Sequence, residues 1–270
     1  RGLGDVYKRQ GLHVSSNDSI SKTLIVAFSL CIVCSVIVST AAVVLKPSQE
    51  ANQALDRKRN ILSAAGMLEE GTSVEEQFAK MNTRVVDLRT GKFTDEVDPA
   101  SYDQRGASKD ASMSDKLSVE EDIAKVFRRE HYALVYLAED AQGSVDKIIL
   151  PIHGYGLWGT LYGFIALEGD ANTVAGIGFY EHKETPGLGG EVDNPRWKSL
   201  WDGKQVYKDG DMELRVIKGT VDPTAKNAEY QVDGMAGATL TTRGVSNLVE
   251  FWLGESGFEP FLNNLKSGEA

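Results

Sequence analysis

The segment 233–244, with the sequence DGMAGATLTTRG, holds the residues best suited to binding chemistry. Glycine or alanine fills five of its positions, and such small residues let the backbone approach a ligand closely. Beyond it, apolar residues recur with the spacing i, i+3, i+4 and i+7 of an amphipathic helix, namely Val245, Leu248, Val249 and Trp252. Because a helix N-terminus attracts anions, this pattern predicts a phosphate-binding loop. An ordinary helix cap without a ligand is the alternative.

This loop does not have the pattern of a nucleotide-binding P-loop. No lysine follows its glycines, and their spacing differs, so the bound phosphate is not expected to belong to a nucleoside triphosphate. The dinucleotide fingerprint GxGxxG after a strand is also absent from the sequence. We therefore do not expect this chain to oxidise NADH by itself.

The loop resembles the flavinylation motif Asp-Gly-x-Ser/Thr-Gly-Ala-Thr of the FMN-binding domain family. The matching residues are Asp233, Gly234, Gly237, Ala238 and Thr239, and Ala236 stands where the family has Ser or Thr. The resemblance implies FMN esterified through its phosphate to Thr239. A threonine hydroxyl is a poor nucleophile, and no His or Lys lies beside this one in sequence, so attachment requires another protein. The resemblance implies an FAD:protein FMN transferase that uses Mg²⁺.

Three further segments, 151–159, 179–191 and 251–261, resemble the NqrC family, which are the C subunits of the Na⁺-translocating NADH:quinone oxidoreductases. With the N-terminal apolar run, the resemblance covers nearly the whole chain from Ser19. It implies an electron-transfer subunit that relays electrons between the redox centres of partner subunits during ubiquinone reduction coupled to Na⁺ export. It also implies a bacterial inner-membrane complex and a C-terminal domain in the periplasm.

In this family the glycine-rich loop at 184–190 lies against the isoalloxazine ring, although such a loop could be a plain turn. Trp158 is expected either in the core or at the ring, and Asp233 either in the transferase recognition signal or in a turn. The expected FMN-binding residues are Trp158, Glu184, Thr185, Pro186, Gly187, Leu188, Asp233, Gly237, Ala238, Leu240 and Thr241.

No catalytic side chain or metal site is expected. The four histidines, His13, His131, His153 and His182, lack metal-site spacing, and no Ser-His-Asp pattern occurs. The net charge of −10 excludes nucleic acid as a partner because phosphates demand a basic face.

The run 23–45 contains no charged residue and, as a helix of roughly 35 Å, would cross the hydrocarbon core. It is too long for the apolar region of a signal peptide, which favours a retained membrane anchor. Cys31 and Cys34 would share one face of this helix, either as small apolar residues or as ligands of a cluster completed by another subunit. The cations after the run favour a cytoplasmic domain, whereas the resemblance implies a periplasmic one.

The remaining pattern predicts an α+β fold of antiparallel hairpins and short helices. Helices are expected at 48–65 with Gly66 after its end, at 73–81 with Ser73 as its cap, at 118–129 from the capping pair Ser118 and Glu121, and from 195 with Asn194 as its cap. The last of these helices is expected to turn Trp197, Leu200 and Trp201 inward, and the polar segment 95–117 is expected to be a loop or linker. Strands are expected at 83–93 (a hairpin), 132–137, 147–150, 161–167, 174–181, 206–207, 212–217 and 229–232. The predicted parts are a non-native leader (1–10), a tail (11–22), the transmembrane helix (23–45), a helical, hairpin and polar linker region (46–117) and one FMN-binding domain (118–270).

Two other functions fit parts of the sequence. The G subunit of the ion-translocating ferredoxin:NAD⁺ oxidoreductase complex shares the flavinylation motif. A membrane-anchored binding or sensory domain would use the same loop without any flavin.

Overall fold

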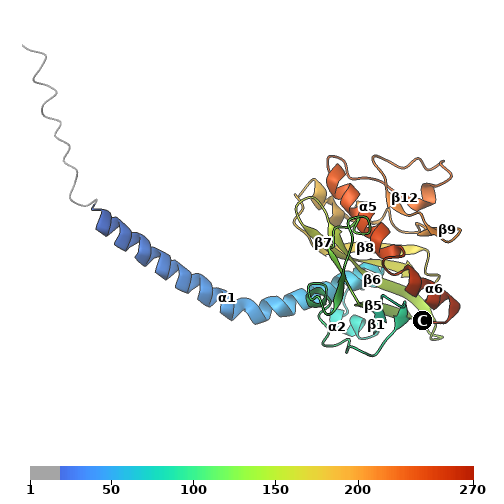
Figure 1. The fold of residues 1–270 in the computed structure, drawn as a ribbon, viewed down its shortest axis with the longest axis horizontal. Helices are drawn as coiled ribbons and strands as arrows, with labels where there is room; N and C mark the ends of the chain where they lie inside the picture. Colours follow the sequence, from blue (N-terminus) through green and yellow to red (C-terminus); the bar gives the residue numbers. More distant parts are fainter. Residues whose placement is uncertain (1–18) are drawn as a thin grey trace, which may run out of the picture. The chain divides into compact units, whose positions relative to one another are not determined.

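The computed structural model describes residues 19–270, so the predicted leader and most of the predicted N-terminal tail lie outside the described residues. The chain divides into two compact units between Gln53 and Ala54 (Figure 1). The unit from Ala54 to Ala270 contains the sheet and the predicted flavin loop.

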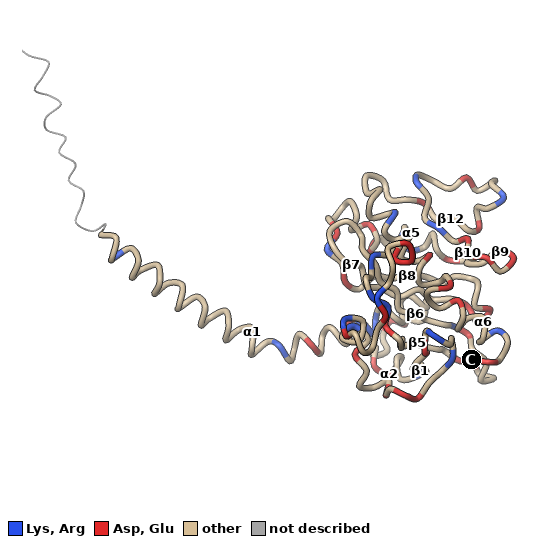
Figure 2. The backbone as a smooth tube through the Cα atoms, in the orientation of Figure 1, with Lys and Arg blue, Asp and Glu red and all other residues tan. Residues whose placement is uncertain are grey.

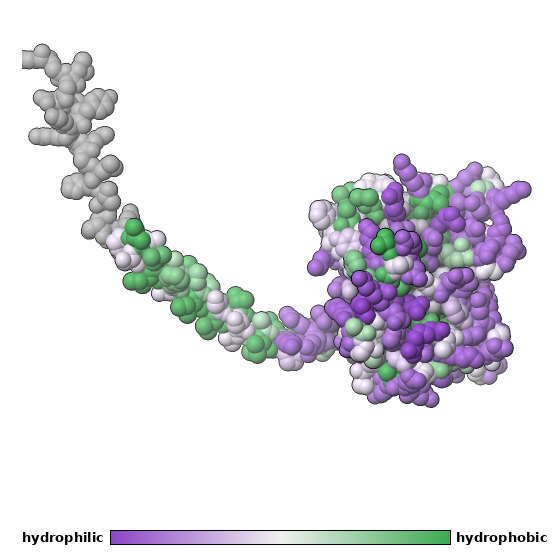
Figure 3. All heavy atoms as spheres, viewed as in Figure 1, coloured by the Kyte–Doolittle hydropathy of each residue, from purple (hydrophilic) through white to green (hydrophobic). Residues whose placement is uncertain are grey.

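Helix α1 (Ile20–Ala64) includes the predicted transmembrane run, and it is long and apolar enough to cross a membrane. The surface of the helix is mostly hydrophobic along this run and hydrophilic after it (Figure 3). The first charged residue after the run is Lys46, and this part of the helix carries charges of both signs (Figure 2). The separate helix predicted from residue 48 is wrong, because α1 continues through Pro47. A proline inside a helix costs about 3 kcal/mol, because it removes one backbone donor and its ring crowds the carbonyl four residues earlier, but it can bend a long helix without ending it. The helix ends as predicted, with Gly66 in the left-handed region.

A six-stranded antiparallel sheet with the order β2-β1-β5-β6-β7-β8 forms the centre of the larger unit (Figure 1). Its strands are β1 (Asn82–Asp87), β2 (Lys92–Phe93), β5 (Tyr132–Glu139), β6 (Val145–Tyr155), β7 (Thr160–Glu168) and β8 (Val174–Glu181). The predicted hairpins and strands in these ranges are confirmed. Since β1 pairs with β5, the predicted region 46–117 supplies part of the same sheet.

Both faces of the sheet are covered, which explains its nearly continuous apolar strands. On one face, α5 (Thr239–Leu253) and α6 (Glu259–Ser267) pack over strand residues such as Ile148 and Leu150. On the other face, the end of α1 and the region around α2 (Val74–Phe78) pack over residues such as Ile149 and Phe164. The predicted α+β architecture is therefore confirmed. The predicted Ser73 cap is also confirmed, although α2 ends at Phe78 rather than near residue 81.

The helix predicted at 118–129 is wrong. Ser118 and Glu121 do form the reciprocal capping contacts that suggested it. However, the Asp122 carboxylate accepts hydrogen bonds from the backbone N–H groups of Val126 and Phe127, at 2.7 and 2.8 Å. A side chain that takes these donors competes with the helical pattern, and the chain turns instead into β4 (Arg128–Glu130).

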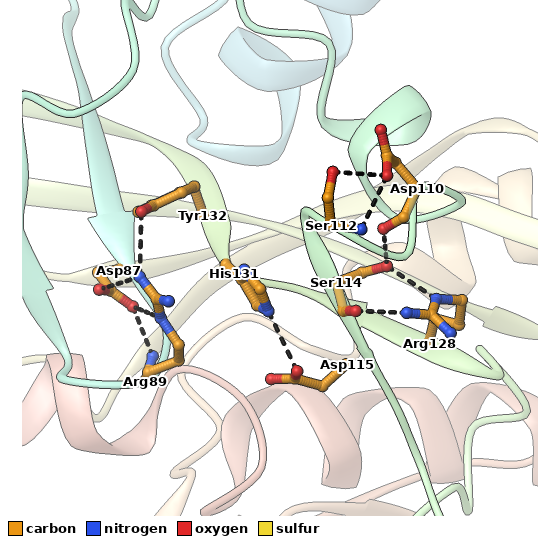
Figure 4. A network of polar contacts seen from close by, with 9 residues as sticks. All are labelled: Asp87, Arg89, Asp110, Ser112, Ser114, Asp115, Arg128, His131 and Tyr132. Carbon is orange, nitrogen blue, oxygen red and sulfur yellow. Dashed lines mark hydrogen bonds and ion pairs between the residues drawn. The ribbon is translucent and has the colours of Figure 1, made fainter.

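The polar segment 95–117, predicted as a loop or linker, contains α3 (Gln104–Ala107) and β3 (Ser114–Lys116), and β3 pairs with β4. Figure 4 shows the polar contacts that fix this hairpin. Arg128 Nε donates to Ser114 Oγ at 2.9 Å, and His131 Nε2 lies 3.1 Å from Asp115 Oδ1. The segment is thus an ordered part of the domain.

Short elements lead from β8 to the predicted flavin loop: η1 (Gly189–Asp193), α4 (Pro195–Lys198), β9 (Tyr207–Lys208), β10 (Asp211–Met212), β11 (Arg215–Val216), η2 (Ala228–Tyr230) and β12 (Gln231–Val232). Asn194 caps α4 through the Arg196 N–H, as predicted. The expectation that Leu200 faces inward with Trp197 and Trp201 is wrong, because Leu200 is exposed.

Candidate functional site

The loop that precedes α5 is shaped by its small residues. Gly237 has a φ of 74°, in the left-handed region that favours glycine, and Ala238 then occupies the N-cap position without a side-chain hydrogen bond. Helix α5 begins at Thr239, and its apolar stripe is buried as predicted. The first N–H groups of the helix therefore point away from the helix body toward this loop.

The three threonine hydroxyls of the loop differ in what they bind. Thr241 Oγ1 donates to Glu184 Oε2 at 2.5 Å, and Thr242 Oγ1 accepts the backbone N–H of Met235 at 3.1 Å. Both of these threonines are buried, whereas Thr239 is exposed and its hydroxyl has no hydrogen-bond partner among residues 19–270. Thr239 is thus the hydroxyl that can form an ester without breaking an existing contact.

Glu184 joins three segments that are far apart in the sequence. Its Oε1 accepts the backbone N–H groups of Leu157 and Trp158, at 2.9 and 3.0 Å, from the turn between β6 and β7. Its Oε2 accepts the Thr241 hydroxyl of α5, and the side chain is almost fully buried. A buried carboxylate with three donors is well satisfied, so Glu184 fixes the turn, its own loop and α5 against one another.

The loop at 184–190 passes too close to this carboxylate for a side chain at Gly189. A Cβ at Gly189 would lie 2.5 Å from Thr241 Oγ1 and would also collide with Glu184. Real Cβ atoms do not approach other atoms so closely, which explains the glycine at this position. The loop therefore does more than make a turn, because its backbone is held against the start of α5.

The segments that Glu184 joins expose four apolar side chains. They are Leu157, Trp158, Leu188 and Leu240, which we call the apolar rim, and their exposed fractions are 38%, 62%, 46% and 54%. Leu188 reaches the loop before α5, since its Cδ2 lies 3.2 Å from a Cβ built at Gly237. Trp158 is thus outside the core, and its place at the ring stays a prediction. A flat ring system with apolar faces suits such a surface.

The structure brings together most of the residues that the sequence suggested, namely Trp158, Glu184, the loop around Leu188, and residues 237–241. Asp233 differs, because its Oδ1 accepts the Val221 N–H at 2.8 Å and its carbonyl accepts Trp197 Nε1 at 2.9 Å. These contacts favour the turn-forming role of Asp233. Sequence reasoning missed Leu157, although it lies directly before Trp158 in the same glycine-rich turn.

Replacing Glu184 by alanine is expected to destabilise the domain by about 2–4 kcal/mol, because two buried backbone donors and the Thr241 hydroxyl lose their acceptor. Urea unfolding of the wild type and the variant measures this change. Glu120→Ala serves as the matched control, since Glu120 is exposed. Equal unfolding midpoints for Glu184→Ala and wild type would contradict the joining role of Glu184.

The FMN-binding domain family matches residues 156–254, which include the apolar rim, Glu184 and Thr239. The larger unit is therefore a flavin-binding module of this class, and the same chain carries a helix long enough to cross a membrane.

Relatives covering almost the whole chain identify the family more closely. The chain is 55% identical over 262 residues to the C subunit of the Na⁺-translocating NADH-quinone reductase of Pseudomonas aeruginosa, covering 95% of this chain and 100% of that protein. It is 50% identical over 257 residues to the C subunit of the Vibrio alginolyticus reductase, covering 94% of this chain and 98% of that protein. The crystal structure of Shewanella oneidensis NqrC matches with a TM-score of 0.74 and 37% identity, covering 80% of this chain and 99% of that one.

The chain belongs to the NqrC family, the C subunits of the Na⁺-translocating NADH-quinone reductases. It is thus one component of a membrane-associated oxidoreductase complex, and it contains an FMN-binding domain. The family predicted from the sequence is confirmed.

Proposed function

We propose that this chain is the covalent-flavin electron carrier of its complex, with FMN esterified to Thr239. The observation that carries the proposal is the position of Thr239 at the first residue of α5, next to Leu188 and Leu240 of the apolar rim. Thr239 is exposed, and its hydroxyl has no hydrogen-bond partner among residues 19–270. Bound FMN supplies reversible one- and two-electron chemistry.

The residues of the chain fit FMN in three respects. The first N–H groups of α5 and its positive dipole end favour a phosphate at Thr239. The apolar rim, in which Leu188 and Leu240 lie next to Gly237 and Thr239, can cover a flat ring and keep water from part of it. Glu184 holds these parts in a fixed geometry, so that the ring position does not depend on a mobile loop.

Attachment requires a second protein. No described side chain is hydrogen-bonded to the Thr239 hydroxyl in a way that could activate it as a nucleophile. An FAD:protein FMN transferase can reach this exposed residue. In that reaction the Thr239 oxygen forms a bond to the FMN phosphorus of FAD, the phosphoanhydride bond breaks, AMP leaves, and a base of the transferase takes the hydroxyl proton.

The membrane helix and the exposed position of Thr239 both suit a role in electron relay. A helix anchored in the membrane keeps the flavin at a high effective concentration near the redox centres of the partner subunits. We propose that the domain works in the periplasm of a bacterial inner membrane and relays electrons during quinone reduction coupled to Na⁺ export. The partner subunits supply the donor and the acceptor.

Mass spectrometry of the peptide that contains residues 233–243 tests the proposal. Protein isolated from a host that has the transferase is expected to carry FMN, less one water, on Thr239. An unmodified peptide from an active complex would contradict the attachment and favour a binding or sensory domain without flavin. Modification at another threonine of the peptide would contradict the assigned residue alone.

A further inference from the structure

The loop at 118–127 exposes apolar side chains that the fold does not use. Val119 is 90% exposed, Phe127 is 69% exposed and Ile123 is 36% exposed. Single exposed apolar residues are common on protein surfaces, but three in one short loop indicate an interaction surface. We call this segment the apolar loop.

The backbone of the apolar loop is held in a conformation that such residues rarely adopt. Lys125 and Phe127 have φ angles of 55° and 67°, in the left-handed region, which is unusual for a bulky aromatic residue. The two hydrogen bonds to the Asp122 carboxylate maintain this conformation. Strain that is held in place by dedicated contacts is typical of segments with a function beyond folding.

The apolar loop shares its support with the candidate flavin site. Asn247 of α5 donates to the Ile123 carbonyl at 3.0 Å, and the Tyr155 N–H at the end of β6 donates to the Ala124 carbonyl at 2.8 Å. The two elements that support the loop also form part of the candidate flavin site, since α5 begins at Thr239 and β6 leads into the turn that contains Trp158. A partner docked on the loop would therefore lie against the same rigid elements as the flavin.

The loop also borders an acidic hollow of about 320 Å³. Of the described residues that line it, five are carboxylates and none is lysine or arginine; the carboxylates are Glu121, Asp211, Glu250, Glu255 and Glu259. Burial, together with the charges of Glu255 and Asp211, raises the pKa of Glu259. Arg129 reaches the wall of the hollow by donating to the Ser256 carbonyl. The hollow therefore favours a positively charged group from outside the domain.

We propose that the apolar loop is a docking surface for another subunit of the complex. This partner subunit contacts Val119 and Phe127 through apolar side chains and places lysine or arginine side chains at the acidic hollow. This inference rests on the family to which the chain belongs and is independent of the attachment to Thr239. Charge argues against two other occupants. A second copy of the chain would bring two acidic hollows together, and an anionic lipid surface would meet Glu120 and Glu121 beside Val119.

A photoreactive benzoylphenylalanine in place of Val119 tests the occupant in native membranes that contain the whole complex. The expected product is a crosslink to another subunit of the complex, in a peptide that lies beside lysine or arginine residues. A crosslink to lipid, a crosslink to a second copy of this chain, or no crosslink would each overturn the proposal.

The double variant Val119→Asn, Phe127→Asn tests whether docking matters for electron transfer. Asparagine tolerates a positive φ better than phenylalanine, so the fold should be retained. Quinone reduction by membranes is expected to fall about tenfold, because buried aromatic contacts contribute most to interfaces. Leu68→Asn is the control, since Leu68 is an exposed apolar residue of the same unit and lies outside the loop.

Flavin fluorescence on denaturing gels separates this proposal from the proposed function. Unchanged fluorescence with slow quinone reduction in the double variant is the expected result. Wild-type rates in the double variant would overturn the docking proposal, whereas a missing flavin in the wild type would overturn the proposed attachment without affecting the crosslink.

Discussion

The variant Thr239→Ala is expected to lose all covalent flavin, so that its band on a denaturing gel shows no flavin fluorescence. The reason is that the other two hydroxyls of the loop are buried and already bonded, Thr241 to Glu184 and Thr242 to the Met235 N–H. Neither can replace Thr239 without breaking a contact in the domain. The complex that contains this variant is expected to lose quinone reduction that depends on the flavin.

Two matched variants make the result specific to position 239. Thr239→Ser keeps a hydroxyl at the same place and is expected to retain fluorescence. Thr241→Val removes a buried hydroxyl and is expected to retain the flavin bond while it lowers stability by about 1–3 kcal/mol, since Glu184 loses a donor. Fluorescence that persists in Thr239→Ala would show that the ester forms elsewhere.

The sequence predicted those parts of the candidate site that lie within one continuous segment. The loop and the helix that begins at Thr239 could be predicted because small residues and an apolar repeat lie within one segment, and the structure has both. The role of Thr239 as the attachment residue comes from the resemblance to the flavinylation motif and stays a prediction. The joining role of Glu184 could not be predicted, because Thr241 follows it by 57 positions and Leu157 precedes it by 27. Contacts between segments so far apart become visible only when the sheet places them.

Local signals failed where a side chain competes with the backbone. The Ser118 and Glu121 contacts predicted a helix and are present, yet the Asp122 carboxylate redirects the chain, and Lys125 and Phe127 adopt left-handed backbone conformations. The same competition produces the apolar loop. This error of the sequence prediction thus coincides with the segment that we propose as a docking surface, as expected for a functional departure from local rules.

Two buried groups, Glu130 and His153, are expected to make the stability of the domain depend on pH in opposite directions. Their effects cancel in the wild type, so its free energy of unfolding is expected to change little because of them between about pH 4.5 and 6.5. Glu130 and His153 line one small cavity beside β6, where β5 no longer pairs with it. Burial raises the pKa of Glu130 from 4.5 to about 7, although its hydrogen bond to Gln104 and the nearby Arg129 act in the other direction. Burial, together with Arg105, lowers the pKa of His153 from 6.5 to about 4.

The signs follow from proton binding in the folded and unfolded states. Between pH 4.5 and 7 the folded state keeps the Glu130 proton that the unfolded state releases, so this group makes stability fall as pH rises. Between pH 4 and 6.5 the unfolded state binds a proton that folded His153 does not, so this group makes stability rise with pH. Each change amounts to about 3 kcal/mol over its window.

Single variants should therefore show a dependence of the free energy of unfolding on pH that cancels in the wild type. In Glu130→Gln, the free energy of unfolding is expected to rise between pH 4 and 6.5, by up to about 1.4 kcal/mol per pH unit, because His153 then acts alone. In His153→Gln, it is expected to fall between pH 4.5 and 7, because Glu130 then acts alone. Urea unfolding at several pH values measures both slopes.

The surroundings of Glu130 explain why the neutral acid is the folded form. Its side chain is fully buried, and its Oε2 has no hydrogen-bond partner among residues 19–270, so a charge on this carboxyl would be poorly solvated. The cavity therefore stabilises the protonated carboxyl beside a neutral imidazole. Parallel pH profiles for Glu130→Gln and His153→Gln would contradict this assignment of charge.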